Sequence, residues 1–377
     1  MTPGRLRLGV DARAFSAPAG GVRRYVSELY RAISDVDADV TIVAFGAADH
    51  RAAIPAAMEW RPVWDLPTNL GWMAASIPLA VRGARLDVYH APAYTAPLWG
   101  MPPQVLTIHD VSYERRPDWN AYKNSRLRRF FYRRAAAAAN RILTDSSFSR
   151  NEIAEAYGIP RERIDVVPLA AGDVFAPGAF DPAAAPAGVK PPYALHVGDL
   201  HVRRNVATAL TAIIEARRAR PDCASLALVC AGVDRGLSSS LVALADEARD
   251  PGSLVLLGPV TESALLNLYR GASLLVYPSR YEGFGLPVVE AMRVGTPVVA
   301  ARCASIPEIA GDSCLLLDPL DVAGWTRTII DVVVHPTYAQ QLADAGRKRA
   351  ATFSWRRTAI ETLTVFRACA RSNARLS

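Results

Sequence analysis

The chain of 377 residues lacks a long hydrophobic run, a leader-like start and a cysteine framework. Because no stretch of about 18 uninterrupted apolar residues occurs, we expect no membrane-spanning helix. The first residues pass directly into a strand-like segment, without an apolar stretch and a small-residue cleavage site, so we expect no secretory signal. The five cysteines are an odd number without a short metal-like spacing, which indicates reduced thiols in a cytoplasmic protein.

Several nucleotide and metal motifs are missing as well. There is no Gly-x-x-x-x-Gly-Lys-Ser/Thr loop, and no Gly-x-Gly-x-x-Gly follows the first expected strand, so ATPase and dehydrogenase functions lose support. An Asp-x-Asp pattern occurs in Asp35–Asp39, but it precedes the expected strand Val40–Phe45. Ligands of open parallel sheets bind beyond the carboxyl ends of the strands. We therefore interpret these aspartates as a solvated turn and predict no catalytic metal.

What the sequence contains is an alternation of short β-branched runs with longer helical segments, in a chain that is 51% hydrophobic. That alternation is typical of parallel α/β sheets. It predicts an α/β protein with two Rossmann-like domains that face each other across a cleft. The expected parts are a first domain over 1–172, a linker rich in Ala, Pro and Gly over 173–192, a second domain over 193–354 and a last helix over 355–377.

The net charge of +7 is unevenly distributed. Nine basic and three acidic residues lie between Asp110 and Arg141, with aromatic residues at 130–132 among the arginines. One interpretation is a solvated helix whose aromatic side chains face the core. The other is a basic, aromatic face over 115–141 that contacts an anionic membrane or a lipid-diphosphate acceptor. We expect no nucleic-acid partner, because no nucleic-acid-binding motif accompanies the charge.

The segment 277–290, YPSRYEGFGLPVVE, is the strongest candidate for a site. We expect a strand, a glycine-containing loop and then a helix that begins at Pro287. The free amides of residues 284–287 and the positive end of that helix would bind negative oxygens, and glycine allows a ligand close to the backbone. Glu282 and Glu290 could accept hydrogen bonds from sugar hydroxyls. The structural alternative is a loop charge at Glu282 and a helix-start acid at Glu290.

A second candidate element, VGDLHVRRN, follows the expected strand Tyr193–Val197. It places Arg203 and Arg204 at a strand-to-helix turn. A cation there would stabilise the negative charge that develops on a departing diphosphate. The alternative is a solvated pair at a helix start, which the helix dipole disfavours.

Two further elements lie in the first half. Gly20 and Gly21 fall between the first strand and the first helix, where backbone amides could reach phosphates, although a plain turn would use the same residues. His109 ends the expected strand Val105–His109, and His90 ends a neighbouring strand and is its rival.

The setting EGFGLPVVEAMRVGTPVVA, in which seven residues separate Glu282 from Glu290, closely resembles the glutamate-pair signature of glycosyltransferase family 4. The resemblance extends to SIPEIAGDSCLLLDP at 305–319 and to VVPLAAGDVF at 166–175, and so covers nearly the whole chain. It implies the GT-B fold, with an acceptor-side first domain, a nucleotide-sugar-binding second domain and a last helix that returns to the first domain. It also implies transfer of a sugar from a nucleotide diphosphate-sugar with retention of configuration.

The resemblance assigns roles to individual residues. Glu290 would bind the ribose, and Glu282 and His109 would contact the transferred sugar. Arg204 stands where family members usually carry lysine, and it keeps the charge. The expected catalytic residues are therefore Glu282, His109 and Arg204. The expected donor-binding residues are Gly20, Gly21, Arg203, Asn205, Gly283, Phe284, Gly285, Leu286 and Glu290.

The opening VDARAF…GGVRRYVSEL and the segment IHDVSY resemble bacterial surface-polysaccharide mannosyltransferases. This implies GDP-mannose as the donor, with other hexoses and UDP donors left open, and a saccharide or lipid-linked saccharide as the acceptor. No cofactor or metal is implied, and the expected location is the cytoplasm, at the inner face of the plasma membrane. Two alternative functions stay open: a GT-B sugar-nucleotide epimerase, and a non-catalytic nucleotide-sugar-binding subunit of a glycosyltransferase complex.

Overall fold

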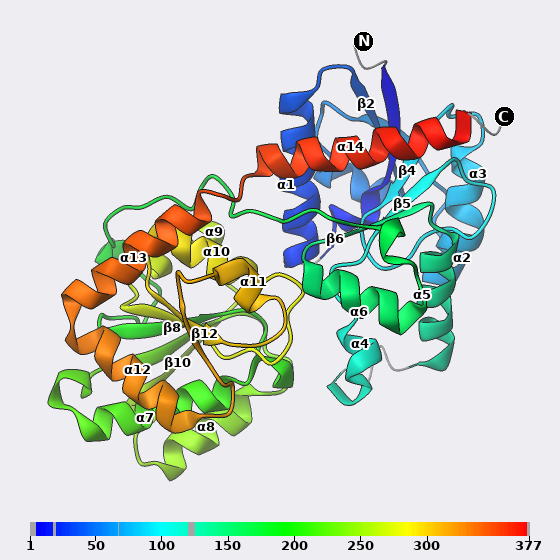
Figure 1. Cartoon of the computed structure of the whole chain (residues 1–377). Helices are drawn as coiled ribbons and strands as arrows, with labels where there is room; N and C mark the ends of the chain where they lie inside the picture. Colours follow the sequence, from blue (N-terminus) through cyan, green and yellow to red (C-terminus); the bar gives the residue numbers. More distant parts are fainter. Residues whose placement is uncertain (1–4, 18–19, 67, 120–124, 375–377) are drawn as a thin grey trace. The chain divides into compact units, whose positions relative to one another are not determined.

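A computed structural model describes residues 5–17, 20–66, 68–119 and 125–374. The chain forms two compact units (Figure 1): unit 1 contains Met1–Leu169 and Ser354–Ser377, and unit 2 contains Ala170–Phe353. Each unit has its own parallel sheet with helices against it, as the alternation of strands and helices in the sequence predicts.

The sheet of unit 1 has seven parallel strands within the described residues, in the order β3-β2-β1-β4-β5-β6-β7. These strands are β1 (Leu6–Asp11), β2 (Val40–Gly46), β3 (Glu59–Pro62), β4 (Val88–Ala91), β5 (Gln104–Thr107), β6 (Arg141–Thr144) and β7 (Ile164–Val166). The central strands are short apolar runs because both of their faces are covered. The order reverses between β1 and β4, and ligands of such sheets bind at the carboxyl ends of the strands around that point.

The helices of unit 1 are α1 (Gly21–Val36), α2 (Asn69–Gly71), α3 (Ile77–Val81), α4 (Ser112–Arg115), α5 (Arg126–Ala138), α6 (Ser147–Tyr157) and α14 (Trp355–Ala374). Sequence analysis missed β3 and the helical segment from α2 to α3. β3 is an edge strand with mostly exposed side chains, so it lacks an apolar run. Gly71 and Pro78 interrupt the helical pattern between α2 and α3, where a wider π-helical turn joins the two.

The last helix, α14, belongs to unit 1 and packs along α1 (Figure 1). The Thr358 hydroxyl donates to the Pro168 carbonyl at 2.7 Å, and Phe366 is fully buried. An Arg367 guanidinium nitrogen lies 2.5 Å from an Asp37 carboxylate oxygen, and both side chains are mostly buried. Asp37 is therefore half of an ion pair that fixes α14, and the interpretation of this turn as solvated was wrong for Asp37.

The sheet of unit 2 has six parallel strands in the described structure, in the order β10-β9-β8-β11-β12-β13. They are β8 (Tyr193–Val197), β9 (Ala227–Ala231), β10 (Leu254–Gly258), β11 (Leu274–Tyr277), β12 (Val298–Ala301) and β13 (Leu315–Leu317). The helices are α7 (Val206–Ala219), α8 (Ser238–Glu247), α9 (Glu262–Gly271), α10 (Leu286–Val294), α11 (Ile306–Ala310), α12 (Val322–Val334) and α13 (Pro336–Ala350).

The segment expected as a free linker, 173–192, packs on unit 2. Phe175 is fully buried, and its ring meets that of Tyr269 edge-on with centroids 5.8 Å apart. The side-chain amide of Asn267 exchanges two hydrogen bonds of 2.8 Å with the backbone of Asp181. Composition alone indicated a linker, but one aromatic anchor and these hydrogen bonds are enough to hold an Ala- and Pro-rich segment on α9.

Each unit encloses a hydrophobic core of its own. In unit 1 the core includes Val43 and Leu106 from the sheet, and in unit 2 it includes Ile213 from α7 and Trp325 from α12. Among the helices of the described residues, none combines the length and the apolar character needed to cross a bilayer.

Candidate active site

The candidate site of unit 2 lies at the carboxyl ends of β8 and β11. These two strands are neighbours, and the strand order reverses between them. A loop and a short helical turn over Val202–Arg204 follow β8, and the loop 278–285 follows β11. The Arg280 amide donates to the Arg203 carbonyl at 2.8 Å, so the two loops are joined at the backbone.

The loop after β11 is tightly held where it enters α10. Gly285 has a φ of +98°, which favours glycine, and a Cβ atom there would lie 2.6 Å from Cδ1 of Ile306 and would displace that side chain. The Ser305 hydroxyl lies 2.9 Å from the Glu282 carbonyl and 3.1 Å from the Phe284 carbonyl, bonding to both. Because α10 begins at the next residue, its first N–H groups and positive dipole end form a site suited to negative oxygens.

Glu282 and Arg204 form a mostly buried ion pair at the centre of this site. Glu282 is 5% exposed, and Nη1 of Arg204 donates to its carboxylate and to the Tyr277 hydroxyl. Arg203 adds a second cation, with Nη1 4.0 Å from the other carboxylate oxygen. The Arg204 guanidinium also lies over the Tyr277 ring, 5.4 Å from its centroid. The carboxylate is thus oriented by two cations.

The surroundings of Arg204 favour an anion. Its Nε atom is buried and has no hydrogen-bond partner in the described part of the chain. Gly198, with a φ of +133°, leaves room for the guanidinium, which a Cβ atom would approach to 3.2 Å. Burial, with the repulsion of Arg204 added, lowers the pKa of His196 to about 3, so this neighbour stays neutral. A guanidinium with an unused N–H beside a neutral histidine can bind a phosphate oxygen.

Glu290 lies in α10 and is 1% exposed. The Tyr269 hydroxyl of α9 donates to its carboxylate at 2.9 Å, which fixes one oxygen. The Thr296 hydroxyl donates to the Tyr269 carbonyl at 2.7 Å, so α9 and the end of α10 are tied together around this tyrosine. Glu290 is therefore an oriented carboxylate on the same helix whose start carries the glycine loop.

The side chain of Asn205 stabilises the turn in which this residue lies. Its φ is +54°, a region that asparagine tolerates better than most residues. Its side-chain amide donates to the Pro319 carbonyl at 2.6 Å, and its oxygen accepts from the Thr208 hydroxyl at 3.1 Å. Both ends of the amide are thus used within unit 2, where they fix the start of α7.

Gly20 and Gly21 of unit 1 lie at the N-terminus of α1, as sequence analysis expected. Gly20 has an extended backbone that any residue adopts, and a Cβ atom on Gly21 would meet nothing within 4 Å. The backbone of Gly20 therefore does not require glycine, and internal packing does not require it at Gly21. The open space beside the first amides of α1 suits a ligand that approaches the backbone.

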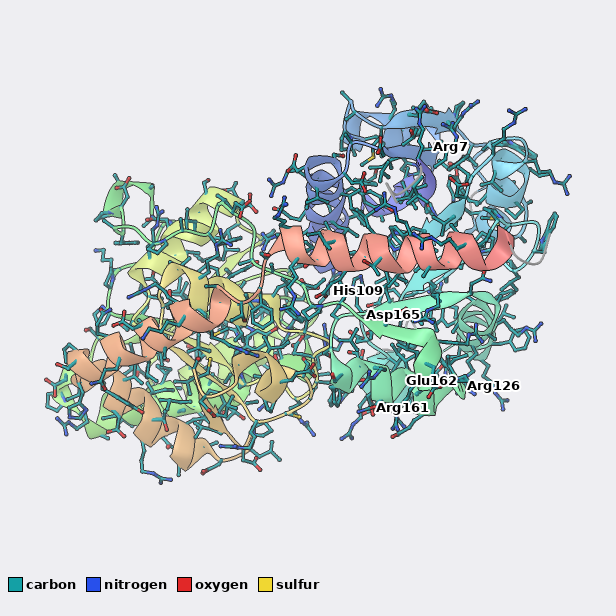
Figure 2. All side chains as sticks on the ribbon, turned by 45° about the horizontal axis from the view of Figure 1, so that its top comes forward. Arg7, His109, Arg126, Arg161, Glu162 and Asp165 are labelled. Carbon is teal, nitrogen blue, oxygen red and sulfur yellow. The ribbon has the colours of Figure 1, made fainter. Side chains whose placement is uncertain are left out.

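His109 follows β5 in unit 1 by two residues. Its position is labelled in Figure 2. Its Nδ1 atom lies 2.8 Å from an Asp145 carboxylate oxygen, and its side chain is 13% exposed. Burial alone would lower the pKa of His109, but attraction and hydrogen bonding to Asp145, with Asp110 adding, outweigh burial and raise it. His90, the rival, is fully buried, with its two ring nitrogens bonded to the hydroxyls of Tyr30 and Thr107. Of these two histidines, only His109 keeps a ring nitrogen without a hydrogen-bond partner of full geometry among the described residues.

Four arginines of the basic segment 115–141 form ion pairs inside unit 1. The ion pairs are Arg115 with Glu152 and Glu155, Arg129 and Arg133 with Glu114, and Arg141 with Asp165. Tyr132 packs against the core, edge-on to Tyr113, whereas Leu127 and Phe130 are 60% and 55% exposed. Lys123, one of the nine basic residues, lies outside the described residues, and so does residue 121, near which the sequence predicts that the basic helix begins. The core-facing interpretation thus holds for Tyr132, whereas contact of the exposed Leu127 and Phe130 with a membrane or an acceptor stays a prediction.

Sequence analysis missed four residues that shape the two sites: Tyr269, Tyr277, Ser305 and Asp145. Asp145 directly follows β6, and a search of every strand end for polar residues would have found it. The roles of Tyr269 and Ser305 depend on contacts between helices and loops distant in sequence, for which a single chain carries no local signal.

Comparisons with known proteins agree with this architecture. Residues 19–170 match the family described as Glycosyltransferase Family 4, and residues 191–335 match the family described as Glycosyl transferases group 1. The structure of Anabaena HepE in complex with UDP and glucose superposes with a TM-score of 0.75 at 16% identity, over 96% of this chain and 100% of that chain.

Two curated relatives extend the similarity at the sequence level. The O-antigen chain mannosyltransferase B of Escherichia coli is 30% identical over 302 residues, 76% of this chain and 76% of the relative. The D-inositol 3-phosphate glycosyltransferase of Mycolicibacterium smegmatis is 30% identical over 364 residues, 87% of this chain and 78% of the relative. The predicted GT-B architecture is thereby confirmed, and the chain belongs to the family 4 glycosyltransferases.

Proposed function

We propose that the protein is a retaining hexosyltransferase that moves mannose from GDP-mannose onto a saccharide or lipid-linked saccharide in surface-polysaccharide synthesis. One observation carries this proposal: the buried Glu282–Arg204 pair between the ends of β8 and β11, beside the glycine-led start of α10. Such a site offers cations and amides for a diphosphate, with an oriented carboxylate next to them for a hydroxyl.

In the proposed reaction, the protein itself stabilises the negative charge of the leaving group. The diphosphate departs, and Arg204 and Arg203 stabilise the negative charge that grows on it. An oxocarbenium-like sugar forms, the acceptor hydroxyl enters from the same face, and a departing phosphate oxygen takes its proton. Glu282 orients the sugar rather than attacking it, because a carboxylate bound to two arginines is a poor nucleophile.

The remaining roles follow the family resemblance. Glu290 binds the ribose hydroxyls, and its fixed hydrogen bond from Tyr269 leaves the carboxylate preoriented for them. His109 contacts the transferred sugar. The other donor-binding residues are Gly20, Gly21, Arg203, Asn205, Gly283, Phe284, Gly285 and Leu286. Asn205 would act through its backbone and by shaping the Arg203–Arg204 turn, since both ends of its side-chain amide are bonded within unit 2.

The donor is tested by nucleotide binding. The mannosyltransferase relative supports mannose as the transferred sugar, whereas the structural neighbour binds UDP and glucose. A ligand that binds only the native state raises the melting temperature. We expect GDP to raise Tm more than UDP or dTDP at equal concentration. A larger rise with UDP would contradict GDP-mannose as the donor. If no nucleotide raised Tm, the proposed donor site itself would be contradicted.

Transfer itself is tested with GDP-mannose and a saccharide acceptor. We expect a glycoside whose anomeric configuration, measured by NMR coupling constants, matches that of the donor. Inverted product would contradict retention. Epimerised or free sugar without glycoside would favour the epimerase, and binding without turnover would favour a non-catalytic subunit.

We propose that no metal or other cofactor takes part, because the two arginines and the α10 amides can supply the charge that a cation would supply on the diphosphate. Transfer activity should survive exhaustive treatment with EDTA. Loss of activity that added Mg²⁺ or Mn²⁺ restores would contradict this.

We also propose that the protein works at the cytoplasmic face of an anionic membrane, where α5 contacts the lipid. Leu127 and Phe130 project from a helix whose Arg126 and Arg134 are exposed, a combination suited to an anionic lipid surface. The double variant Leu127→Ser, Phe130→Ser should lose cosedimentation with vesicles that contain phosphatidylglycerol. Ile360→Ser, which removes a 47% exposed apolar side chain from α14, is the matched control and should bind as wild type does.

A further inference from the structure

A buried polar network surrounds His109, and the proposed reaction does not use it. It comprises a carboxylate on one ring nitrogen, a tyrosine ring against the imidazole, and a chain of hydrogen bonds that leads away through the sheet.

The first part is the contact between His109 and Asp145. The two residues follow neighbouring parallel strands, β5 and β6, so their side chains emerge at the same edge of the sheet. Asp145 is 3% exposed, and one of its carboxylate oxygens lies 2.8 Å from Nδ1 of the imidazole. The Ser149 hydroxyl of α6 donates to the His109 carbonyl at 3.1 Å, which fixes the backbone of the same residue.

This contact decides where the ring carries its proton. An ionised carboxylate only accepts hydrogen bonds, so the Nδ1 atom bonded to Asp145 carries hydrogen. The Nε2 atom is left as the nitrogen that can meet a ligand. It is buried and has no hydrogen-bond partner of full geometry among the residues that the structure describes, and the Pro92 carbonyl is a backbone oxygen near the ring that favours its protonated form.

The second part is Tyr25 of α1. Its ring meets the His109 ring edge-on, with centroids 4.8 Å apart and an angle of 83°. Its hydroxyl lies 3.1 Å from the Thr107 hydroxyl, which in turn lies 2.8 Å from Nε2 of His90. Nδ1 of His90 lies 2.7 Å from the Tyr30 hydroxyl. This series of hydrogen bonds anchors Tyr25, and Tyr25 restricts the rotation of the His109 imidazole.

The charges that face His109 favour its protonated form. Asp145 and Asp110 attract the cation, and the Pro92 carbonyl favours it as well, together outweighing the cost of burial. Tyr94, with its ring centroid 6.1 Å from that of His109, adds no charge. His90 does not compete for a proton, because burial and the proximity of His109 lower the pKa of His90 to about 3.

We propose that Asp145 is a positioning residue that holds His109 as an imidazolium, so that Nε2–H donates a hydrogen bond to an oxygen of the bound sugar. The proposal rests on the proposed function for the identity of that ligand. His109 then orients the sugar and transfers no proton, and donor use is lost when the imidazolium loses its proton at high pH. Asp145 acts only through His109, by fixing the tautomer, the orientation and the charge of the ring.

The first test reads the ring itself, without substrate. The protein labelled at histidine Cε1 is titrated by NMR, and the His109 signal is assigned by its loss in His109→Gln. We expect His109 in wild type to titrate above the ordinary histidine range. In Asp145→Asn, which keeps the shape but removes the charge, its pKa should fall below that of wild type. Asp110→Asn is the matched control, because its carboxylate bonds Ser112 instead of the ring, and should lower the pKa less.

The second test reads donor use against pH. In wild type, kcat/KM for the donor should fall on the alkaline side with the pKa that NMR gives for His109. In Asp145→Asn that limb should move to lower pH by the same amount, and kcat/KM at pH 8 should fall about 10–100-fold, as for the loss of a residue that orients a functional histidine. Circular dichroism checks that the variant is folded, and Tyr25→Phe, which keeps the ring, should leave the alkaline limb in place.

The outcomes separate the two proposals. An unchanged His109 pKa in folded Asp145→Asn overturns the positioning role, and so does an alkaline limb that stays in place while the NMR pKa moves. A wild-type protein without transfer activity overturns the proposed function, and the NMR titration then decides the His109–Asp145 pair by itself.

Discussion

Glu282 and Arg204 neutralise each other inside unit 2, and this sets the effect of a substitution at either position. Glu282→Gln keeps the shape of the side chain but removes the charge that orients the sugar. We expect turnover to fall about 10²–10³-fold, the usual cost of removing a transition-state contact. Affinity for the nucleoside diphosphate should change little, because Arg204 stays and loses only a competitor.

Glu290→Gln is the matched control for that substitution. It retains the oxygen that accepts from Tyr269, so the start of α10 stays fixed. Because Glu290 is assigned to the ribose, this variant should weaken nucleotide binding more than it lowers turnover at saturation. Steady-state kinetics and calorimetry with GDP distinguish the two patterns, and equal effects of both substitutions would contradict the division of roles.

Arg204 is expected to contribute to both binding and stability. Arg204→Lys restores the residue usual in the family and keeps one cation, so GDP affinity should stay close to wild type. Arg204→Ala removes charge-assisted hydrogen bonds to the diphosphate and should weaken GDP binding roughly 10–100-fold. It also leaves Glu282 buried beside only the more distant Arg203, which costs on the order of 3–5 kcal/mol of unfolding free energy.

Calorimetry at pH 7 on Arg204→Lys and Arg204→Ala measures the affinity, and thermal unfolding measures the stability. Equal GDP affinity in wild type and Arg204→Ala would contradict the proposal that Arg204 binds the diphosphate.

At the scale of elements, α14 determines the stability of unit 1. It is the last segment of the chain, yet its contacts are with α1 and with the strands of the first sheet. Truncation after Phe353 should therefore unfold or strongly destabilise unit 1, whereas unit 2, which ends at Phe353, should keep its cooperative transition. Phe366→Ala is the milder form of this test and should cost about 3–5 kcal/mol.

Native-state hydrogen exchange resolves the two units in the α14 experiment. Loss of protection in β1 and β4 with protection retained in β8 and β11 is the expected pattern. Uniform loss across both sheets would contradict the assignment of α14 to unit 1 alone.

Most elements could be predicted from the sequence because their apolar pattern is local. β8 begins and ends where sequence analysis placed it, and β2 begins at the expected Val40 and ends one residue after the expected Phe45. β5 ends at Thr107, two residues earlier than expected, and this places His109 and Asp110 in a loop. The sequence did not predict β3 or the segment from α2 to α3, because an exposed edge strand and a helix interrupted by glycine and proline carry little periodic signal.

At the scale of the whole molecule, each unit carries one histidine that stays neutral inside the fold. The pKa of His90 in unit 1 and that of His196 in unit 2 are each lowered to about 3, first of all by burial. The unfolded chain takes up protons at these positions below about pH 6.5, and the folded chain does not. The contribution of these two histidines to the unfolding free energy is therefore complete above that pH. It falls as the pH drops from about 6.5 toward 3, by on the order of 2 kcal/mol per histidine at pH 5.

Urea unfolding at pH 7.5 and pH 5.0 measures this loss. His196→Gln removes the titrating group from unit 2 and should reduce the acid sensitivity of that unit while leaving unit 1 as sensitive as before. His109 works in the opposite direction: its raised pKa adds stability below about pH 6.5 that is lost as the pH rises through the folded value. Equal stability of unit 2, which does not contain His109, at both pH values in wild type would contradict the buried, neutral state of His196.

The sequence by itself determined the two parallel sheets, the family and the segment 277–290, because these depend on local apolar period and on contiguous motifs. Only the tertiary structure decided that Arg204 bonds Glu282, that Tyr269 bonds Glu290 and that Asp145 bonds His109, each pair at least 21 residues apart in sequence. The tertiary structure also decided that the segment 173–192 packs with unit 2 and that Asp37 forms an ion pair with α14. The physical reason is that a strand or helix follows from neighbouring residues, whereas the partner of a buried charge depends on which strand ends the sheet order brings together.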